Sequence, residues 1–296
     1  MFGIVKSVIR KMLFQMQLQF ERTKHWLRKT FSGSKQPDTQ LVVCGYPRSG
    51  TSLFYNMLSS SLTDYLYTEG EDSSLNNIWK NGNIVTKSPY DTINLSKGRI
   101  QKSNYLKKNI YVIIIVRDLR DVITSKHLWA PDDYMIGYDD KTLVITGRYP
   151  NYKKEFNGPG IGTYYKAIKN ILEMPELKVM LVNYEDLIKD PDSCQKKVGD
   201  YFGINFDEKF SDYHLRKEKH GLRYEGDQAP IDSKLHKSSS LVTSEYVCRW
   251  RKPEHYERIK SEFGGNDEFM KILIDYGYEK DANWYAEFLN AVQSNA

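Results

Sequence analysis

The chain has 296 residues, of which 27% are charged and 40% hydrophobic, and it carries a formal net charge of +5. This is the composition of an ordinary folded protein, and the length suits one large domain or two small ones. The charge is uneven, because residues 1–36 contain eight basic side chains and one acidic one. The rest is near neutral, so we expect no nucleic-acid partner, whose binding requires a basic domain surface.

Residues 1–31 have the periodicity of a helix, with basic side chains between the apolar ones. Lys6 and Arg10 interrupt the apolar stretches, so no run reaches the roughly 18 residues that span a bilayer. The same charges interrupt a signal-peptide core. Three interpretations stay open: a helix packed on the domain, an interfacial helix that makes the protein peripheral to a membrane, and a targeting peptide.

A polar stretch at residues 32–40 has the composition of a short linker. It divides the chain into residues 1–36, a basic amphipathic helix with its linker, and residues 37–296, the main domain.

Beyond residue 40, short apolar runs alternate with amphipathic stretches. The runs predict strands at 41–45, 83–89, 110–116 and 178–184, and the stretches predict helices at 52–62, 118–129 and 191–203, with two more between 253 and 276. Strands that alternate with helices indicate an α/β fold, with a central parallel sheet covered by helices on both faces. The stretch 128–163 lacks clear periodicity, and we expect a loop there of the kind that often forms a substrate lid.

The first expected strand leads into the sequence GYPRSGTS, at residues 45–52, and then into a helix. This is the organisation of a phosphate-binding loop, in which backbone N–H groups point at an anion. In the ATP-binding version a lysine follows the second glycine, but here Thr51 follows Gly50. The loop instead carries a basic residue, Arg48. It is suited to a phosphate-like group and lacks the lysine of magnesium–triphosphate chemistry.

Four segments resemble the sulfotransferase family that uses 3′-phosphoadenosine-5′-phosphosulfate (PAPS). YPRSGTS resembles the family's 5′-phosphosulfate loop, and VRDLRDVITS, at 116–125, resembles its 3′-phosphate motif. VNYEDLIKDPDSC resembles its YEDL segment, and CRWRKPEHYERIKSEFG resembles its C-terminal segment, with Cys248 where a glycine is usual. Their order and spacing over residues 42–278 imply the P-loop-like sulfotransferase fold, of a type closer to the carbohydrate and bacterial members than to the cytosolic phenol type.

The resemblance implies which residues hold the nucleotide. It implies that the 5′-phosphate is bound by the loop residues Arg48, Ser49, Gly50, Thr51 and Ser52. Arg48 also faces the leaving oxygen, where arginine acts as a fixed charge because it does not readily donate its proton.

The remaining nucleotide contacts come from the later motifs. Arg117 and Ser125 clamp the 3′-phosphate, and Tyr184 contacts the adenine. The basic pair that the family carries before its C-terminal tryptophan is absent, so Arg249 or Arg251 is the candidate for the 3′-phosphate charge, with Arg249 as the assigned residue. PAPS is then the cosubstrate, and no metal is required.

The general base is the one catalytic role that the motifs do not assign to a residue. In glycan-modifying members a glutamate precedes the Lys-Ser or Lys-Thr pair, but in TKSPY that place holds Thr86. We assign Lys87 an electrostatic role and predict that an acid of the turn at 69–72 is the base, with Glu69 as the candidate. Glu71 and Asp72 share that turn, and His127 is the alternative outside it.

The sequence thus predicts sulfuryl transfer from PAPS to a hydroxyl or amine. The TKSPY element favours a carbohydrate or glycolipid acceptor, while the 22 tyrosines also allow a phenol or tyrosyl peptide. Two other functions stay open: a P-loop kinase of a small molecule, and a non-catalytic nucleotide-binding protein on the same fold. The three cysteines, Cys44, Cys194 and Cys248, form no disulfide framework or zinc pattern, so we expect a cytoplasmic protein.

Overall fold

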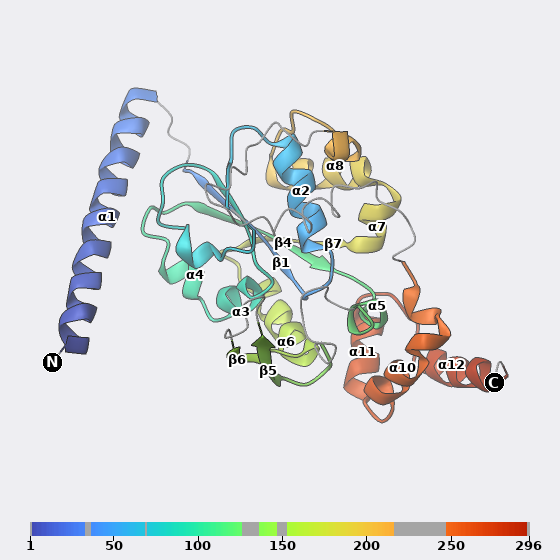
Figure 1. Ribbon diagram of the computed structural model, residues 1–296. Coiled ribbons are helices and arrows are strands. Elements are labelled where there is room, and N and C mark those ends of the chain that lie inside the picture. Colours follow the sequence, from blue (N-terminus) through green and yellow to red (C-terminus); the bar gives the residue numbers. More distant parts are fainter. Residues whose placement is uncertain are drawn as a thin grey trace.

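The fold was analysed in a computed structural model of the chain (Figure 1). The structure describes residues 2–32, 37–68, 70–125, 136–146, 153–215 and 247–294.

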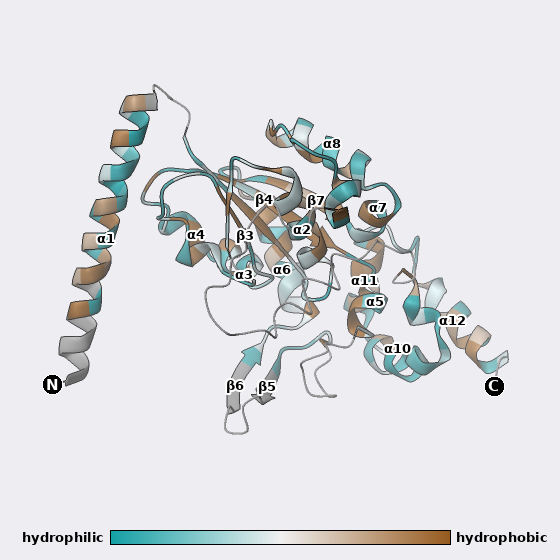
Figure 2. Cartoon of the chain, turned by 45° about the horizontal axis from the view of Figure 1, so that its top comes forward, coloured by the Kyte–Doolittle hydropathy of each residue, from teal (hydrophilic) through white to brown (hydrophobic). Residues whose placement is uncertain are grey.

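A five-stranded sheet in the order β2-β3-β1-β4-β7 forms the centre of the molecule, and all its neighbouring strands are parallel. The strands are β1 (Thr39–Gly45), β2 (Leu66–Tyr67), β3 (Ile84–Lys87), β4 (Asn109–Val116) and β7 (Lys178–Asn183). β4 is almost entirely apolar, as its brown colour in Figure 2 shows, and β1 is apolar from Leu41 to Cys44. Strands of this kind are buried on both faces.

Successive side chains of β1 enter two different cores. Val42 and Cys44 belong to one cluster of buried residues, and Leu41 and Val43 belong to the other. This is the alternation that a pleated strand imposes. The sheet is therefore covered on both faces, and the predicted α/β class is confirmed.

Helices complete both layers (Figure 1). The cluster of Leu41 and Val43 includes side chains from α2 (Thr51–Ser61), α7 (Tyr184–Lys189) and α8 (Pro191–Phe202). The cluster of Val42 and Cys44 includes side chains from α3 (Asp91–Ser96), α4 (Arg99–Lys102), α5 (Leu119–Ile123), α6 (Ile161–Leu172), α10 (Tyr256–Phe263), α11 (Asp267–Asp275) and α12 (Asn283–Ser294).

The connections reverse direction beside β1. The chain leaves β1 through α2 toward β3 on one side, and it leaves β4 through α5 and α6 toward β7 on the other. Such a reversal opens a crevice at the carboxyl ends of the two strands, which is where open α/β sheets bind ligands. The loop after β1 and the residues after β4 meet at this crevice.

The helix expected at 118–129 is much shorter in the structure, since α5 ends at Ile123. Ser125 follows the helix and is not part of it. The expected loop at 128–163 is also partly wrong, because it contains an antiparallel pair, β5 (Lys141–Thr146) and β6 (Lys153–Gly158). Residues 126–135 and 147–152, where the lid was expected, lie outside the described part.

α1 (Phe2–Ser32) is a single long helix at the side of the domain (Figure 1). Leu18 is only 3% exposed, and Arg28 forms an ion pair with Asp38 just before β1. The linker predicted at 32–40 is thus too long, because Asp38 is buried and β1 begins at Thr39. Among the described residues no helix has the length and apolarity to cross a membrane.

Candidate active site

The loop after β1 turns tightly before α2 begins. Ser49 donates from its backbone N–H and its Oγ to the carbonyl of Tyr46, at 3.2 and 2.7 Å. Gly50 precedes α2 with φ 99°, which favours glycine, and a Cβ there would lie 2.3 Å from Cδ2 of Tyr184. The N-terminus of α2, with Thr51 buried and Ser52 exposed, therefore opens onto the crevice as an anion site would.

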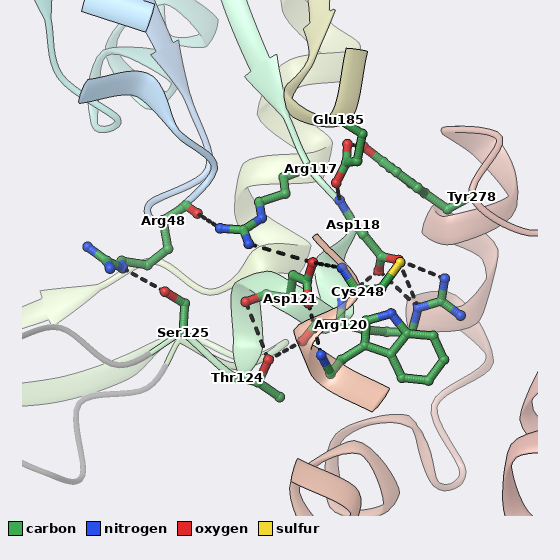
Figure 3. Close-up of polar contacts among 11 residues, drawn as sticks. Arg48, Arg117, Asp118, Arg120, Asp121, Thr124, Ser125, Glu185, Cys248 and Tyr278 are labelled. Carbon is green, nitrogen blue, oxygen red and sulfur yellow. Dashed lines mark hydrogen bonds and ion pairs between the residues drawn. The ribbon is translucent and has the colours of Figure 1, made fainter. Parts of the chain in front are cut away.

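Arg48 is the centre of the contacts in the crevice (Figure 3). Its Nε donates to Oγ of Ser125 at 3.1 Å, and its carbonyl accepts from Nη1 of Arg117 at 3.2 Å. Its φ of 68° lies in the left-handed region, uncommon for a residue with a side chain. The structure thus brings together three of the residues that the sequence assigned to the nucleotide.

Arg117 emerges from β4 and is largely buried. Its Nη2 lies 3.6 Å from Oδ2 of Asp121, and its guanidinium stacks 4.5 Å from the ring centre of Tyr184. Tyr184 is itself buried against Gly50. The residue expected to meet the adenine therefore joins the phosphate loop to Arg117.

Asp121 points toward the C-terminal segment. It accepts from the backbone N–H groups of Cys248 at 2.8 Å and Trp250 at 3.0 Å. Burial raises the pKa of Asp121, and the charge of Arg117 opposes that shift. These bonds position the segment that carries Arg249, which is half-buried.

Cys248 departs from the glycine usual in the family, and the structure shows why glycine suits this position. Its φ is 58°, a left-handed conformation that side chains disfavour. The bond from its N–H to Asp121 holds the backbone in place. Cys248 is an exposed free thiol.

A second group of ion pairs and hydrogen bonds is centred on Asp118, the residue after Arg117. Arg120 donates from Nε and Nη2 to the two carboxylate oxygens of Asp118, at 2.9 and 2.7 Å, and lies 4.1 Å from the ring centre of Trp250. The N–H of Asp118 donates to Oε1 of Glu185 at 3.0 Å, and the hydroxyl of Tyr278 donates to Oε2 at 2.6 Å. These hydrogen bonds were not predicted from the sequence, although the acids that form them belong to the VRDLRD and YEDL segments.

Lys87 ends β3 on the other side of the loop. Its Nζ donates to Oγ of Ser52 at 3.1 Å and to Oε1 of Glu71 at 3.1 Å. The lysine is buried, whereas the side chain of Glu71 is 61% exposed. The structure therefore places one carboxylate of the expected 69–72 turn beside the first turn of α2.

The other candidates for the base, and the nearby acid Asp91, are placed differently. Glu69 and His127 lie outside the described residues. Both carboxylate oxygens of Asp72 accept from asparagine amides at 2.7 Å. Asp91 is buried and accepts from Ser73, from the N–H of Ser74 and from an asparagine amide. Burial raises the pKa of Asp91.

Thr86 occupies the position that is glutamate in glycan-modifying members. Its side chain is buried, accepts from Nε2 of Gln40 at 3.0 Å and meets Oγ of Ser74 at 2.5 Å. Thr86 therefore belongs to the interior between β1 and β3, and it does not replace the missing glutamate.

With this geometry in view, the chain matches the family model described as the sulfotransferase domain over residues 38–258. The chain belongs to this family. It is a sulfotransferase, a transferase enzyme. The match begins one residue before β1 and includes the loop after β1, the residues after β4 and the segment around Trp250.

Relatives with curated names agree with the family. Sulfotransferase 2A6 of Mus musculus is 24% identical, over 63% of this chain and 70% of its own length. Sulfotransferase 2A1 of Rattus norvegicus is 25% identical over the same shares, and the flavonol sulfotransferase-like protein of Flaveria bidentis is 24% identical over 42% of this chain and 37% of its own. The carbohydrate or bacterial subtype stays a prediction.

Two solved structures are also similar. The sulfotransferase domain of the Synechococcus PCC 7002 olefin synthase has 16% identity and a TM-score of 0.44, covering 74% of this chain and 89% of that one. The sulfotransferase domain from the curacin biosynthetic pathway has 14% identity and a TM-score of 0.40, covering 77% and 98%.

Proposed function

We propose that residues 37–296 transfer the sulfuryl group of PAPS to a hydroxyl or amine acceptor. The observation that carries the proposal is the Arg48–Arg117 pair at the crevice beside β1. Its hydrogen bond joins the phosphate loop to the arginine of the 3′-phosphate motif. Two fixed cations next to a helix N-terminus suit a ligand with phosphates at both ends of its ribose.

The residues of the loop also argue against a magnesium-bound triphosphate as the ligand. Thr51 stands where a P-loop kinase has its lysine, and this residue is buried at the start of α2. The residues that fit PAPS are Arg48, Ser49, Gly50, Thr51, Ser52, Arg117, Ser125, Tyr184 and Arg249.

Three residues have roles in the transfer step. Glu71 accepts the proton of the acceptor hydroxyl while the acceptor oxygen bonds to sulfur. The bond from sulfur to the bridging oxygen of the 5′-phosphate breaks, and its electron pair stays on that oxygen. Arg48 stabilises the charge that develops there, as a preorganised cation does. Lys87 holds both the Glu71 carboxylate and Ser52.

Glu71 takes the place of Glu69 in this proposal because of its contacts. The Lys87 ammonium orients its carboxylate, and its exposure leaves room for an acceptor. Asp72 and Asp91 have their carboxylates occupied by hydrogen bonds.

The acceptor belongs to the carbohydrates or glycolipids in this proposal. Support comes from the TKSPY segment, which resembles that of glycan-modifying members and whose lysine donates to Ser52 at the start of α2. A screen with labelled PAPS and hydroxyl, phenol and amine acceptors separates the acceptor classes.

The donor is tested by single-turnover transfer from labelled PAPS in the presence of a chelator. Sulfuryl transfer without magnesium is expected, and 3′-phosphoadenosine 5′-phosphate should raise the melting temperature more than ATP with magnesium does. Magnesium-dependent phosphoryl transfer from ATP would instead establish a kinase. Tight binding of the nucleotide with no turnover on any acceptor would establish a binding protein.

The base is tested with Glu71→Gln and its neighbour Asp72→Asn as the control. Glu71→Gln should lower kcat about 10²- to 10⁴-fold, the usual contribution of a positioned base, and leave nucleotide affinity unchanged. It should also remove the acidic limb of the pH–rate profile. A Glu71→Gln enzyme with normal kcat would exclude Glu71.

A further inference from the structure

α1 has two faces of different character. The inner face packs on the domain: Leu18 is buried, Phe14 meets the ring of Trp79 edge-on at 5.6 Å, and Glu21 accepts from the N–H of Asn81 at 2.8 Å. Farther along the same face, Arg28 and Lys29 pair with Asp38. Phe14, Leu18 and Glu21 are four and three residues apart, and Arg28 follows Glu21 by seven residues, so they form one stripe along the helix.

A second stripe runs along the opposite side of α1 and is apolar. Its members are spaced by three, four or seven residues and are between 39% and 85% exposed: Ile9, Leu13, Met16, Phe20, Leu27 and Phe31. We call them the outer stripe. At a rise of 1.5 Å per residue it is about 33 Å long. Apolar patches of this extent on a protein surface mark an interaction site.

One flank of the outer stripe is basic, with Arg10 and Lys24 along it. The other flank carries Met12, Thr23 and Thr30, and Arg22 lies toward the inner face, four residues after Leu18. The one acid of residues 1–36, Glu21, belongs to the inner face and accepts from Asn81. Figure 2 shows the resulting mixture of apolar and polar bands on α1.

We infer that the outer stripe of α1 lies in the surface of an anionic membrane. A helix with apolar side chains on one face and basic side chains beside that face lies in the plane of the interface, where apolar burial and attraction to anionic lipids act together.

A second copy of the chain is a weaker occupant of the outer stripe. Pairing two such helices would bring together two segments that each carry eight basic residues and one acid. Like charges beside a helix seam oppose pairing. Thr23 and Thr30 also interrupt the apolar repeat on this side of α1. Anionic lipid complements the positive charge of α1, whereas a second copy would place the same positive charge against it.

The position of α1 leaves the candidate active site open. Asp38 and Asn81, which hold the inner face, come just before β1 and β3, at the amino edge of the sheet. Arg48 and Arg117 follow β1 and β4, at the carboxyl edge. A membrane bound to α1 thus lies across the sheet from the crevice (Figure 1).

The test is flotation of the full-length chain with vesicles of phosphatidylcholine alone or with added phosphatidylserine. Binding to the anionic vesicles is expected, and it should weaken as salt is added. Met16→Gln/Phe20→Gln should lower the bound fraction more than tenfold, because burial of each such side chain is worth about ten- to a hundredfold. Met16→Leu/Phe20→Leu should bind like the original chain.

The charge control is Lys196→Gln/Lys197→Gln on α8, far from α1, and this variant should keep its binding. All variants should keep the melting temperature of the original chain, because the substituted side chains are exposed. Two results would overturn the inference: no binding to anionic vesicles, or binding that survives Met16→Gln/Phe20→Gln. Concentration-dependent dimers that the glutamine variant abolishes, without vesicle binding, would assign the outer stripe to a second copy.

Discussion

The guanidinium of Arg117 holds the backbone carbonyl of Arg48 at 3.2 Å, across the crevice between the ends of β4 and β1. One arginine thus positions the other, because Arg48 sits in a left-handed conformation that few side chains adopt. The two motifs that resemble the family's nucleotide-binding segments form a single unit in the fold.

Arg117→Ala should therefore weaken binding of 3′-phosphoadenosine 5′-phosphate by about 1.5–3 kcal/mol, the usual worth of a hydrogen bond to a charged group. The preference over adenosine 5′-phosphate should shrink as well, because Arg117 is assigned to the 3′-phosphate. Calorimetric titration with both nucleotides measures this, with Arg99→Ala on α4 as control. An unchanged preference would refute the assignment.

Gly50→Ala should destabilise the protein more than Gly98→Ala, although both glycines have positive φ. A Cβ at Gly98 meets nothing within 4 Å, so only the left-handed strain of about 1–2 kcal/mol applies. At Gly50 the Cβ would also enter the ring of Tyr184, which adds about 1–3 kcal/mol of overpacking. Chemical denaturation of both variants measures the difference. Equal losses would mean that Tyr184 moves aside freely.

Much of the fold was predictable because the buried strands stand out in the sequence as short apolar runs. β1, β4 and β7 start within two residues of the predicted positions, and α8 lies between Asp190, which caps its first turn, and Gly203 in the left-handed conformation. The β5–β6 pair escaped prediction because it lies outside the main sheet, in a sequence rich in turn formers. α12 was also missed, since its packing against Trp250 is a tertiary contact.

Only the parts of the site that belong to sequence motifs could be predicted. The phosphate loop, Arg117 and Ser125 follow local patterns, and the structure brings them together. The role of Asp121 escaped prediction, because its partners are backbone N–H groups more than 100 residues away. The contact of Lys87 with Glu71 also depends on a turn that no local pattern specifies.

Asp38→Asn should lower stability near neutral pH by about 1–2 kcal/mol, a value reduced for the partial exposure of Arg28. Burial alone would raise the pKa of Asp38, but hydrogen bonds from Arg28, the N–H of Gly82 and Lys29 hold it below its ordinary value of 3.8. A depressed pKa contributes stability above that value, and the contribution disappears as the pH falls through the lowered pKa.

Melting curves of both chains between neutral and acid pH measure the effect of Asp38. The difference between wild type and Asp38→Asn should shrink below pH 3.8. The control is Asp200→Asn, whose exposed pair with Lys196 should contribute almost nothing. A difference that persists unchanged in acid would show that Asp38 acts through packing and not through its charge.

Arg48→Ala tests the electrostatic role in the transfer step. The loop amides and the N-terminus of α2 remain available to the 5′-phosphate, so affinity for the desulfated nucleotide should change little. Loss of one preorganised charge at the leaving oxygen should lower turnover about a hundred- to a thousandfold. Arg48→Lys should recover much of the rate, because lysine restores the charge and the sulfotransferase loop often carries it.

Single-turnover transfer and nucleotide affinity, measured for both Arg48 variants, separate binding from chemistry. The loop faces the crevice, so both variants should fold, and their melting temperatures check this. Ser125→Ala is the matched control, since it removes the partner of the Arg48 Nε but leaves the charge in place. Its rate should fall much less than that of Arg48→Ala. An alanine variant that binds poorly and turns over normally once saturated would make Arg48 an anchor, and Lys87 would then be the cation that faces the leaving oxygen.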